Sequence, residues 1–97
     1  FIITGKPDFA PGHNNLGVVY MEKGLIDEAI KEFKITIRLD PNFPDAYANL
    51  GLAYKNKGLL KEAMENLEQA LTLSPEHRDA RRRMDEVRRL LEGQIIK

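Results

Sequence analysis

The sequence has no cysteine and only two histidines. Without cysteine the chain has no disulfide bond, no thiolate nucleophile and no thiolate metal ligand. His13 takes a packing position in a helical pattern and His77 lies in a turn, and neither has neighbours at metal-ligand spacing. No glycine-rich loop precedes a Lys-Ser or Lys-Thr pair, so the sequence lacks that kind of phosphate-binding loop. We therefore expect a non-enzymatic chain with no catalytic residue, no metal site and no cofactor.

Net charge and long apolar runs are also lacking. Lys and Arg total 15 against 15 Asp and Glu, so net charge does not direct the chain to nucleic acid or to an anionic membrane. No apolar run approaches the roughly 18 residues of a membrane-spanning helix, and we expect no membrane insertion. The first residue is Phe, so a signal sequence could have been removed or could lie outside this sequence. The compartment stays open, with the cytoplasm favoured for a soluble domain.

What the sequence does contain is an internal repeat with a period of thirty-four residues. The segment Asn15–Leu25 recurs as Asn49–Leu59, with Leu-Gly, Tyr and Lys-Gly-Leu at the same places. The match covers a whole unit, because Glu28 recurs as Glu62, Ala29 as Ala63, Leu39 as Leu73 and Pro41 as Pro75. A period of this length is typical of stacked repeat proteins.

The first half of each unit is predicted to be a helix that ends at a glycine. Leu16 and Tyr20 recur at helical spacing, and Gly24 stands where a helix end needs a left-handed residue. The following helix begins almost at once, so the two must be antiparallel neighbours. Gly17 and Ala29 lack bulk and would let the helices approach closely where they cross.

The second half of each unit is predicted to be an amphipathic helix. Asp27 and Glu28 suit its positive N-terminal end, and Asp40-Pro41 stops it. Its apolar stripe consists of Ile26, Ala29, Ile30, Phe33 and Ile37. The patterns together predict helices over 11–23, 26–39, 44–57 and 60–73.

A helix, a glycine turn, a helix and a proline stop at this period resemble the tetratricopeptide repeat. The departures, at His13, Thr36, Tyr47 and Leu67, keep roughly the volume that a packed helical pair needs. The resemblance implies an all-α fold of antiparallel helix pairs, stacked as a right-handed α-solenoid. The residues that carry it are Leu16, Gly17, Tyr20, Ala29, Phe33 and Pro41, then Leu50, Gly51, Tyr54, Ala63, Leu67, Ala70 and Pro75.

The domain organisation follows from this register. Residues 1–97 form one domain, with repeat 1 at 10–43, repeat 2 at 44–77, and a capping helix with a tail at 78–97. Pro7 and Phe9 align with Pro41 and Phe43, so residues 1–9 are interpreted as the remnant of a preceding repeat. A leader, ordered or frayed, is the alternative.

The C-terminal segment is predicted to cap the stack. Gly93 is a plausible helix end, and acids lie at helical pairing distance from arginines, as Asp79 does from Arg83 and Asp85 from Arg89. This pairing favours a solvating cap over a nucleic-acid patch, and we expect no nucleic-acid partner. The narrow apolar stripe of this helix is Ala80, Met84, Val87 and Leu91.

The first helix of each unit should line the concave side of the stack, which is the candidate binding groove. We expect its surface to be polar with an apolar strip at Val18 and Leu52, and we expect Ala48 to be exposed there. The predicted inner face comprises Pro11, Asn14, Asn15, Val18, Met21 and Glu22, then Asp45, Ala48, Asn49, Leu52, Lys55 and Asn56, then Asp79, Arg82, Arg83, Glu86 and Arg89.

Two asparagines stand one repeat apart on this face. Asn15 and Asn49 each precede Leu-Gly, and a carboxamide offers one acceptor and two donors to the amides of an extended peptide. The arrangement is similar to the asparagine ladder of the repeat arrays on O-linked N-acetylglucosamine transferases. The alternative is that these side chains bond neighbouring backbone or water.

Chaperone-binding members of the family grip a terminal carboxylate with Lys, Asn, Asn, Lys and Arg. The corresponding places here hold Asn14, Val18, Asn49, Asp79 and Arg83, of which Asn49 and Arg83 agree. Asp79 would repel the carboxylate, so we predict no standard clamp of this kind.

We therefore predict a protein-protein interaction module that binds an extended or helical segment in its groove. One alternative is a self-assembling scaffold that acts through its repeat ends, and another is an accessory array of a larger enzyme. Phe1, Ile2, Ile3 and Phe9 would make an apolar N-terminal edge, with Ile95 and Ile96 as a second apolar segment, so a homo-oligomer through that edge is also expected.

Overall fold

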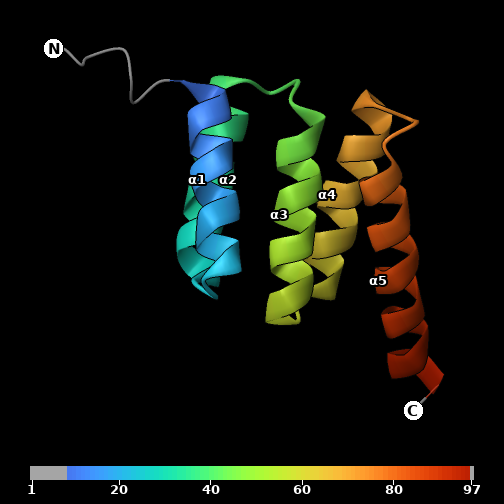
Figure 1. The fold of residues 1–97 in the computed structure, drawn as a ribbon. Coiled ribbons are helices and arrows are strands. Elements are labelled where there is room, and N and C mark those ends of the chain that lie inside the picture. Colours follow the sequence, from blue (N-terminus) through green and yellow to red (C-terminus); the bar gives the residue numbers. More distant parts are fainter. Residues whose placement is uncertain (1–8, 97) are drawn as a thin grey trace, which may run out of the picture.

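The computed structural model describes residues 9–96, with side chains described as far as Gly93. Successive helices run antiparallel, and Figure 1 shows α1, α3 and α5 in one layer with α2 and α4 in a second layer behind it. This all-α stack of helix pairs is the predicted fold. The helices are α1 (Ala10–Glu22), α2 (Ile26–Leu39), α3 (Pro44–Lys57), α4 (Leu60–Leu73) and α5 (Arg78–Ile96). The predicted remnant of a preceding repeat lies, apart from Phe9, outside the described residues.

The helix boundaries follow the punctuation of the sequence. The bounds of α2, α3 and α4 are as predicted, and α1 begins and ends one residue early. Gly24 and Gly58 adopt φ of 80° and 84°, the left-handed conformation that ends a helix without a Cβ clash. A proline occupies the first turn of α1 and of α3, where its missing N–H costs no hydrogen bond.

The prediction that Gly93 ends the last helix is wrong. Helix α5 continues through Gly93 to Ile96, and Gly93 has no positive φ. Leu91, two residues before Gly93, still packs against the core, and no proline or turn-forming residue follows Gly93. Helical hydrogen bonding therefore continues past this glycine.

The core lies between neighbouring units rather than in one centre. One cluster joins α2 to α3 and consists of Ala29, Ile30, Phe33, Leu50 and Ala53. A second joins α3, α4 and α5 and consists of Ala48, Leu60, Ala63, Leu67, Ala70, Ala80, Met84 and Val87. Burying a side chain such as Phe33 or Leu67 completely contributes roughly 1.5–3 kcal/mol, so stability depends on each unit having its neighbour.

The predicted close approach at the first glycine of each unit is a contact with a large side chain. A Cβ on Gly17 would lie 2.4 Å from Cε1 of Phe33, and one on Gly51 would lie 2.6 Å from Cγ of Leu67. Ala29 is fully buried beside Phe33, as expected of a small residue at the crossing. The glycines thus leave the space that Phe33 and Leu67 fill.

Ala48 is a correction to the predicted inner face. It is only 1% exposed, because α5 packs across α3 as well as α4 and brings Ala80 and Met84 into the same cluster. A helical period gives the apolar face of α5 but does not show that this face has two neighbouring helices. In the described part of the chain, no helix is long and apolar enough to cross a membrane.

Candidate functional site

A groove with a volume of about 340 Å³ opens on the side of the stack formed by the first helices. Its walls and apolar floor come from α1 and α3, Phe33 of α2 lies beneath that floor, and α5 contributes one edge. The lining residues are Val18, Met21 and Glu22 of α1, Phe33 of α2, Asn49, Leu52 and Asn56 of α3, and Arg83 of α5. The structure therefore has a groove on the side of the stack where the sequence predicted one.

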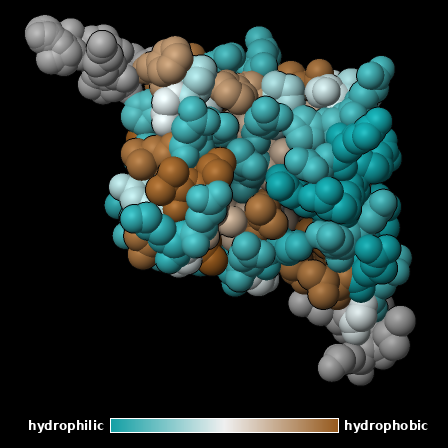
Figure 2. All heavy atoms as spheres, viewed as in Figure 1, coloured by the Kyte–Doolittle hydropathy of each residue, from teal (hydrophilic) through white to brown (hydrophobic). Residues whose placement is uncertain are grey.

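The floor of the groove is apolar. Val18, Met21 and Leu52 are half-buried over the fully buried ring of Phe33. Figure 2 looks onto this side, where hydrophobic atoms gather over α1 and hydrophilic atoms dominate over α5. An apolar side chain of a ligand would be buried from water where it contacts this floor.

Arg83 forms the edge of the groove that α5 contributes. Its Nη1 donates a hydrogen bond of 3.1 Å to the backbone oxygen of Ala48, which leaves its other N–H groups for the groove. Burial lowers the pKa of the Arg83 guanidinium from its usual value, while the charge of Asp79 opposes that change. The group is a partly desolvated cation that stays protonated.

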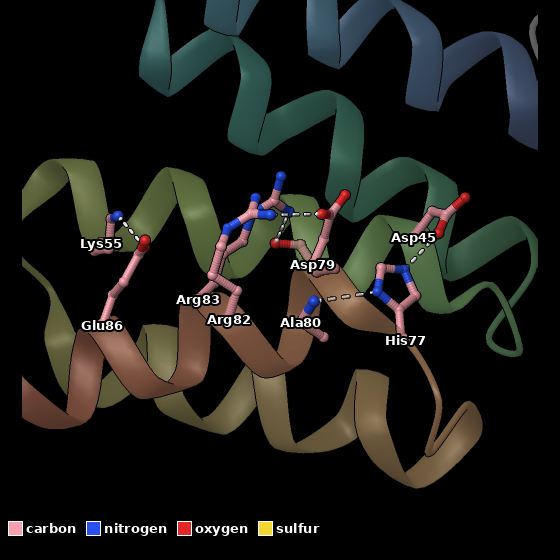
Figure 3. Close-up of polar contacts among 9 residues, drawn as sticks. Asp45, Lys55, His77, Asp79, Ala80, Arg82, Arg83 and Glu86 are labelled. Atoms are coloured by element: carbon pink, nitrogen blue, oxygen red, sulfur yellow. Dashed lines mark hydrogen bonds and ion pairs between the residues drawn. The ribbon is translucent and has the colours of Figure 1, made fainter.

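The neighbouring charges on α3 and α5 are paired with one another (Figure 3). Lys55 Nζ lies 2.8 Å from Glu86 Oε1, and this hydrogen bond lowers the pKa of Glu86. Arg82 lies 3.1 Å from Asp79. Lys55, Arg82 and Glu86 were predicted to face a ligand, but none of them lines the groove, so Arg83 is the cation among the described lining residues.

Glu22 supplies the opposite charge at the α1 wall, in the last turn of that helix. The carboxamide of Asn56 lies on the α3 wall and is exposed. The groove thus carries an acid on one wall, a cation on another edge, and an apolar floor between them.

Asn14 needs a correction as a predicted ligand contact. It is 8% exposed, and its Oδ1 accepts a hydrogen bond of 3.1 Å from Nδ2 of Asn49. It is buried because it lies on the face of α1 that packs into the stack. Asn49 lines the groove but gives one donor to Asn14, whereas Asn15 is exposed and is not among the lining residues.

Sequence reasoning missed Phe33 as a lining residue. It belongs to the core stripe of α2, and a stripe pattern cannot tell that its fully buried ring lies beside the groove. The predicted pairs of the cap also differ, since Asp79 meets Arg82 and Asp85 meets Arg88 at 3.3 Å. Arg83 donates a hydrogen bond to the backbone oxygen of Ala48 instead.

Both histidines have structural contacts. His13 Nδ1 lies 2.8 Å from Glu32 of α2, and His77 Nε2 lies 2.6 Å from Asp45 of α3. His77 Nδ1 also accepts the N–H of Ala80 at 3.1 Å, which caps the first turn of α5 (Figure 3). Within the part of the chain that the structure describes, no three His, Cys, Asp or Glu residues are grouped as metal ligands.

Two family models match the sequence. One, described as TPR repeat, matches residues 19–58, and one described as tetratricopeptide repeat matches residues 44–77. Together they span residues 19–77, which lie within the two predicted repeats at 10–43 and 44–77. A search of the curated proteins finds no match.

Solved structures of similar fold cover nearly the whole chain. The Sgt2 TPR domain from Aspergillus fumigatus has a TM-score of 0.90 at 20% identity, over 94% of this chain and 62% of that one. The first TPR of Spaghetti (RPAP3), bound to an HSP90 peptide, has 0.86 at 21%, over 90% and 69%. The second TPR domain of human RPAP3, in complex with an HSP70 peptide, has 0.83 at 27%, over 89% and 72%.

Proposed function

Because this chain belongs to the tetratricopeptide repeat family, we propose that it is a non-catalytic module that binds a segment of another protein in its groove. The observation that carries the proposal is the groove itself. It has a volume of about 340 Å³, an apolar floor that includes Val18 and Leu52, and exposed polar groups on its walls. Apolar pockets with a few convergent polar groups are the usual form of a binding site.

We propose that an extended peptide crosses the groove between α1 and α5. One apolar side chain lies on the floor, and the carboxamides of Asn49 and Asn56 bond the peptide backbone. Arg83 offers its remaining N–H groups to a carboxylate or carbonyl, and Glu22 accepts a donor at the other wall. A segment with an acidic group beyond an apolar residue fits this order of charges.

The ligands of the similar structures are not carried over to this chain. The two RPAP3 domains hold HSP90 and HSP70 peptides. Here Asn14 is buried against Asn49, Val18 offers no hydrogen bond, and Asp79 lies beside Arg83. We therefore propose a ligand other than a chaperone tail, and tight binding of such a tail that Arg83→Ala abolishes would contradict this.

The asparagine ladder is kept as a proposal in modified form. One N–H of the Asn49 carboxamide is donated to Asn14, so its oxygen and its second N–H remain for a peptide. Asn15 is exposed one repeat away and would act only on a ligand that extends past the groove. Replacing Asn15 alone should then weaken the binding of long peptides and leave the binding of short peptides unchanged.

The experiment that tests the proposal uses a peptide library displayed on beads, followed by calorimetry of the selected peptides. Asn56→Ala should weaken a selected peptide by about 0.5–1.5 kcal/mol for the lost hydrogen bond, and Leu52→Ala should weaken it further through lost apolar contact. Asn66→Ala is the matched control, because the Asn66 carboxamide lies on α4 and bonds the backbone of Glu62. Equal losses in Asn56→Ala and Asn66→Ala, or no selected peptide at all, would refute a groove site.

A further inference from the structure

A second cleft lies beside the first turns of α5 and has a volume of about 380 Å³. Pro75 and Glu76, in the turn before α5, form one part of its lining. The arginines Arg78, Arg81 and Arg82 of α5 form another. Among the residues that the structure describes, none lines both this cleft and the groove. The cleft is therefore a separate site with a different chemistry.

The three arginines of the cleft share one face of α5. Residues three and four apart on a helix are surface neighbours, with Cβ atoms about 5–6 Å apart. All three side chains are exposed, and Arg82 is paired with Asp79 at 3.1 Å (Figure 3). In the described part of the chain, the guanidinium groups of Arg78 and Arg81 have no hydrogen bond and no ion pair. Two cations of this cleft are thus available to an anion.

The histidine of the cleft has a structural role. His77 Nε2 lies 2.6 Å from Asp45 Oδ1, and His77 Nδ1 accepts the N–H of Ala80 at 3.1 Å. Both ring nitrogens are therefore occupied, and the imidazole already caps the first turn of α5. Anion binding in this cleft would depend on the guanidinium groups and not on the start of the helix.

The arginines stand where the preceding unit has packing residues. Arg81 and Arg82 correspond to Tyr47 and Ala48 of α3, and both of those pack in the cluster shared by α3, α4 and α5. A helix that packed on α5 in the same manner would have to remove two guanidinium groups from water, which is strongly unfavourable. This face is therefore suited to a charged ligand and not to another helix pair.

Carboxylates limit the size of the anion that fits. Glu76 precedes the arginines and Asp85 follows them, and both line the same cleft. Their charges repel the successive phosphates of a nucleic acid, whereas a single compact anion can contact the arginines without extending to either carboxylate. A phosphate monoester carries about two negative charges and three acceptor oxygens, so it can bond more than one guanidinium group.

We propose that this cleft binds a phosphorylated serine or threonine on a segment of a partner protein. The phosphoryl oxygens accept N–H groups of Arg78 and Arg81, and the N–H groups of Arg82 that Asp79 does not use add a further contact. Arginine clusters are a recurring means of recognising phosphorylated segments. Because the arginines are exposed, the cleft does not enclose a free ion, and the peptide beside the phosphoryl group adds contacts along Pro75.

The test selects peptides from a degenerate library with a fixed central phosphoserine and measures their affinity by fluorescence polarisation. A selected peptide should bind at least about tenfold more tightly than the same peptide with serine or glutamate, because the phosphoryl group has more charge and more acceptors. Selection of no peptide, or equal affinity of the glutamate peptide, would contradict the proposal.

Two matched variants show whether the cleft itself is responsible. Arg81→Gln should reduce the affinity of a selected phosphopeptide about tenfold through the lost charge-assisted hydrogen bonds. Arg89→Gln removes the same charge from an exposed position of α5 outside the cleft and should leave the affinity unchanged. Equal losses in the two variants would mean attraction by overall charge only, and the proposal would be wrong.

An NMR titration of the labelled chain with the selected phosphopeptide locates the site. The side-chain Nε–H signals of Arg78 and Arg81 should shift, and the amide signals of Leu52 and Asn56 in the groove should not, so the two sites are tested separately. Inorganic phosphate that binds as tightly as the phosphopeptide would mean an adventitious ion only. A double-stranded oligonucleotide that binds more tightly would assign the arginines to nucleic acid. Either result, or shifts confined to the groove, would overturn the proposal.

Discussion

At the scale of single residues, the glycines of this chain have opposite effects that sequence position alone does not reveal. Gly17 gives room to the fully buried Phe33 ring, since a Cβ there would stand 2.4 Å from Cε1. Gly93 lies inside α5 with nothing within 4 Å of the place where a Cβ would be. One glycine is required by packing, and the other only loosens a helix.

Alanine at these two positions should therefore change stability in opposite directions. Gly17→Ala should lower the free energy of unfolding by about 1–3 kcal/mol through overpacking against Phe33. Gly93→Ala should raise it by up to about 0.5–1 kcal/mol, because alanine has the higher helix propensity. Urea unfolding of both variants measures the difference, and a neutral Gly17→Ala would show that the Phe33 ring moves aside freely.

The exposed ion pair between Asp27 and Lys57 shifts the pKa values of both side chains. The hydrogen bond and charge of Lys57 lower the pKa of Asp27 below its ordinary 3.8, and those of Asp27 raise the pKa of Lys57 above 10.5. A lowered carboxyl pKa adds stability above the unfolded-state value and loses it as the pH falls through the folded-state value. The stability that the lowered pKa of Asp27 contributes is therefore lost in acid, as the pH falls below 3.8.

We expect Lys57→Met to move the pKa of Asp27 back towards 3.8 in an NMR titration. Lys61→Met, at the start of α4, is the control and should leave that pKa where it is. If Lys57→Met has no effect, the bridge between α2 and α3 does not form in solution.

At the scale of elements, α5 packs against two helices, α4 and α3. Its stripe of Ala80, Met84 and Val87 is buried in the cluster with α4, while Arg83 and Glu86 bond Ala48 and Lys55 of α3. These polar contacts fix the rotation of α5, and that rotation brings Arg83 to the edge of the groove. The charged outer face of the same helix remains in water.

Ala48→Leu tests whether α5 covers α3 in this way. The extra volume at a side chain 1% exposed should cost about 1–3 kcal/mol of stability, as should Ala63→Leu between α3 and α4. Gln69→Leu on the exposed face of α4 is the control and should change stability by less than about 0.5 kcal/mol. If thermal melts show that Ala48→Leu is as stable as the control variant, α5 does not pack over Ala48.

At the scale of the whole molecule, each helix contacts mainly its neighbours, and the dimensions of 55 × 28 × 17 Å reflect that linear stack. Helix α3 has core contacts on both sides, through Leu50 with α2 and through Ala48 with α5. Helix α1 packs on α2 and leaves Leu16 and Val19 exposed. Stability should thus be highest in the middle and lowest at the α1 end.

Native-state hydrogen exchange should resolve this gradient. We expect amides of α3 and α4 to exchange most slowly and amides of α1 to exchange first, since opening α1 breaks contacts on one side only. A single exchange rate for all helices would instead mean that the stack unfolds as one cooperative unit.

The sequence by itself determined the helices, their pairing and the family, because these depend on local signals that recur. Apolar spacing, Gly24 and Gly58 in a left-handed conformation, and proline in the first turns fixed three of five helices to the residue. The same periodicity identified Val18, Leu52, Asn49 and Arg83 as inner-face residues before their contacts were known.

Only the tertiary structure decided which inner-face residues line the groove. The rotation of α5 over α3 buried Ala48, aimed Arg83 at the carbonyl of Ala48 and paired Lys55 with Glu86. The contact between α1 and α3 turned Asn14 onto Asn49. These outcomes depend on crossing angles and on side chains from different repeats, which a helical period cannot specify, because it gives the face of each helix but not its neighbour.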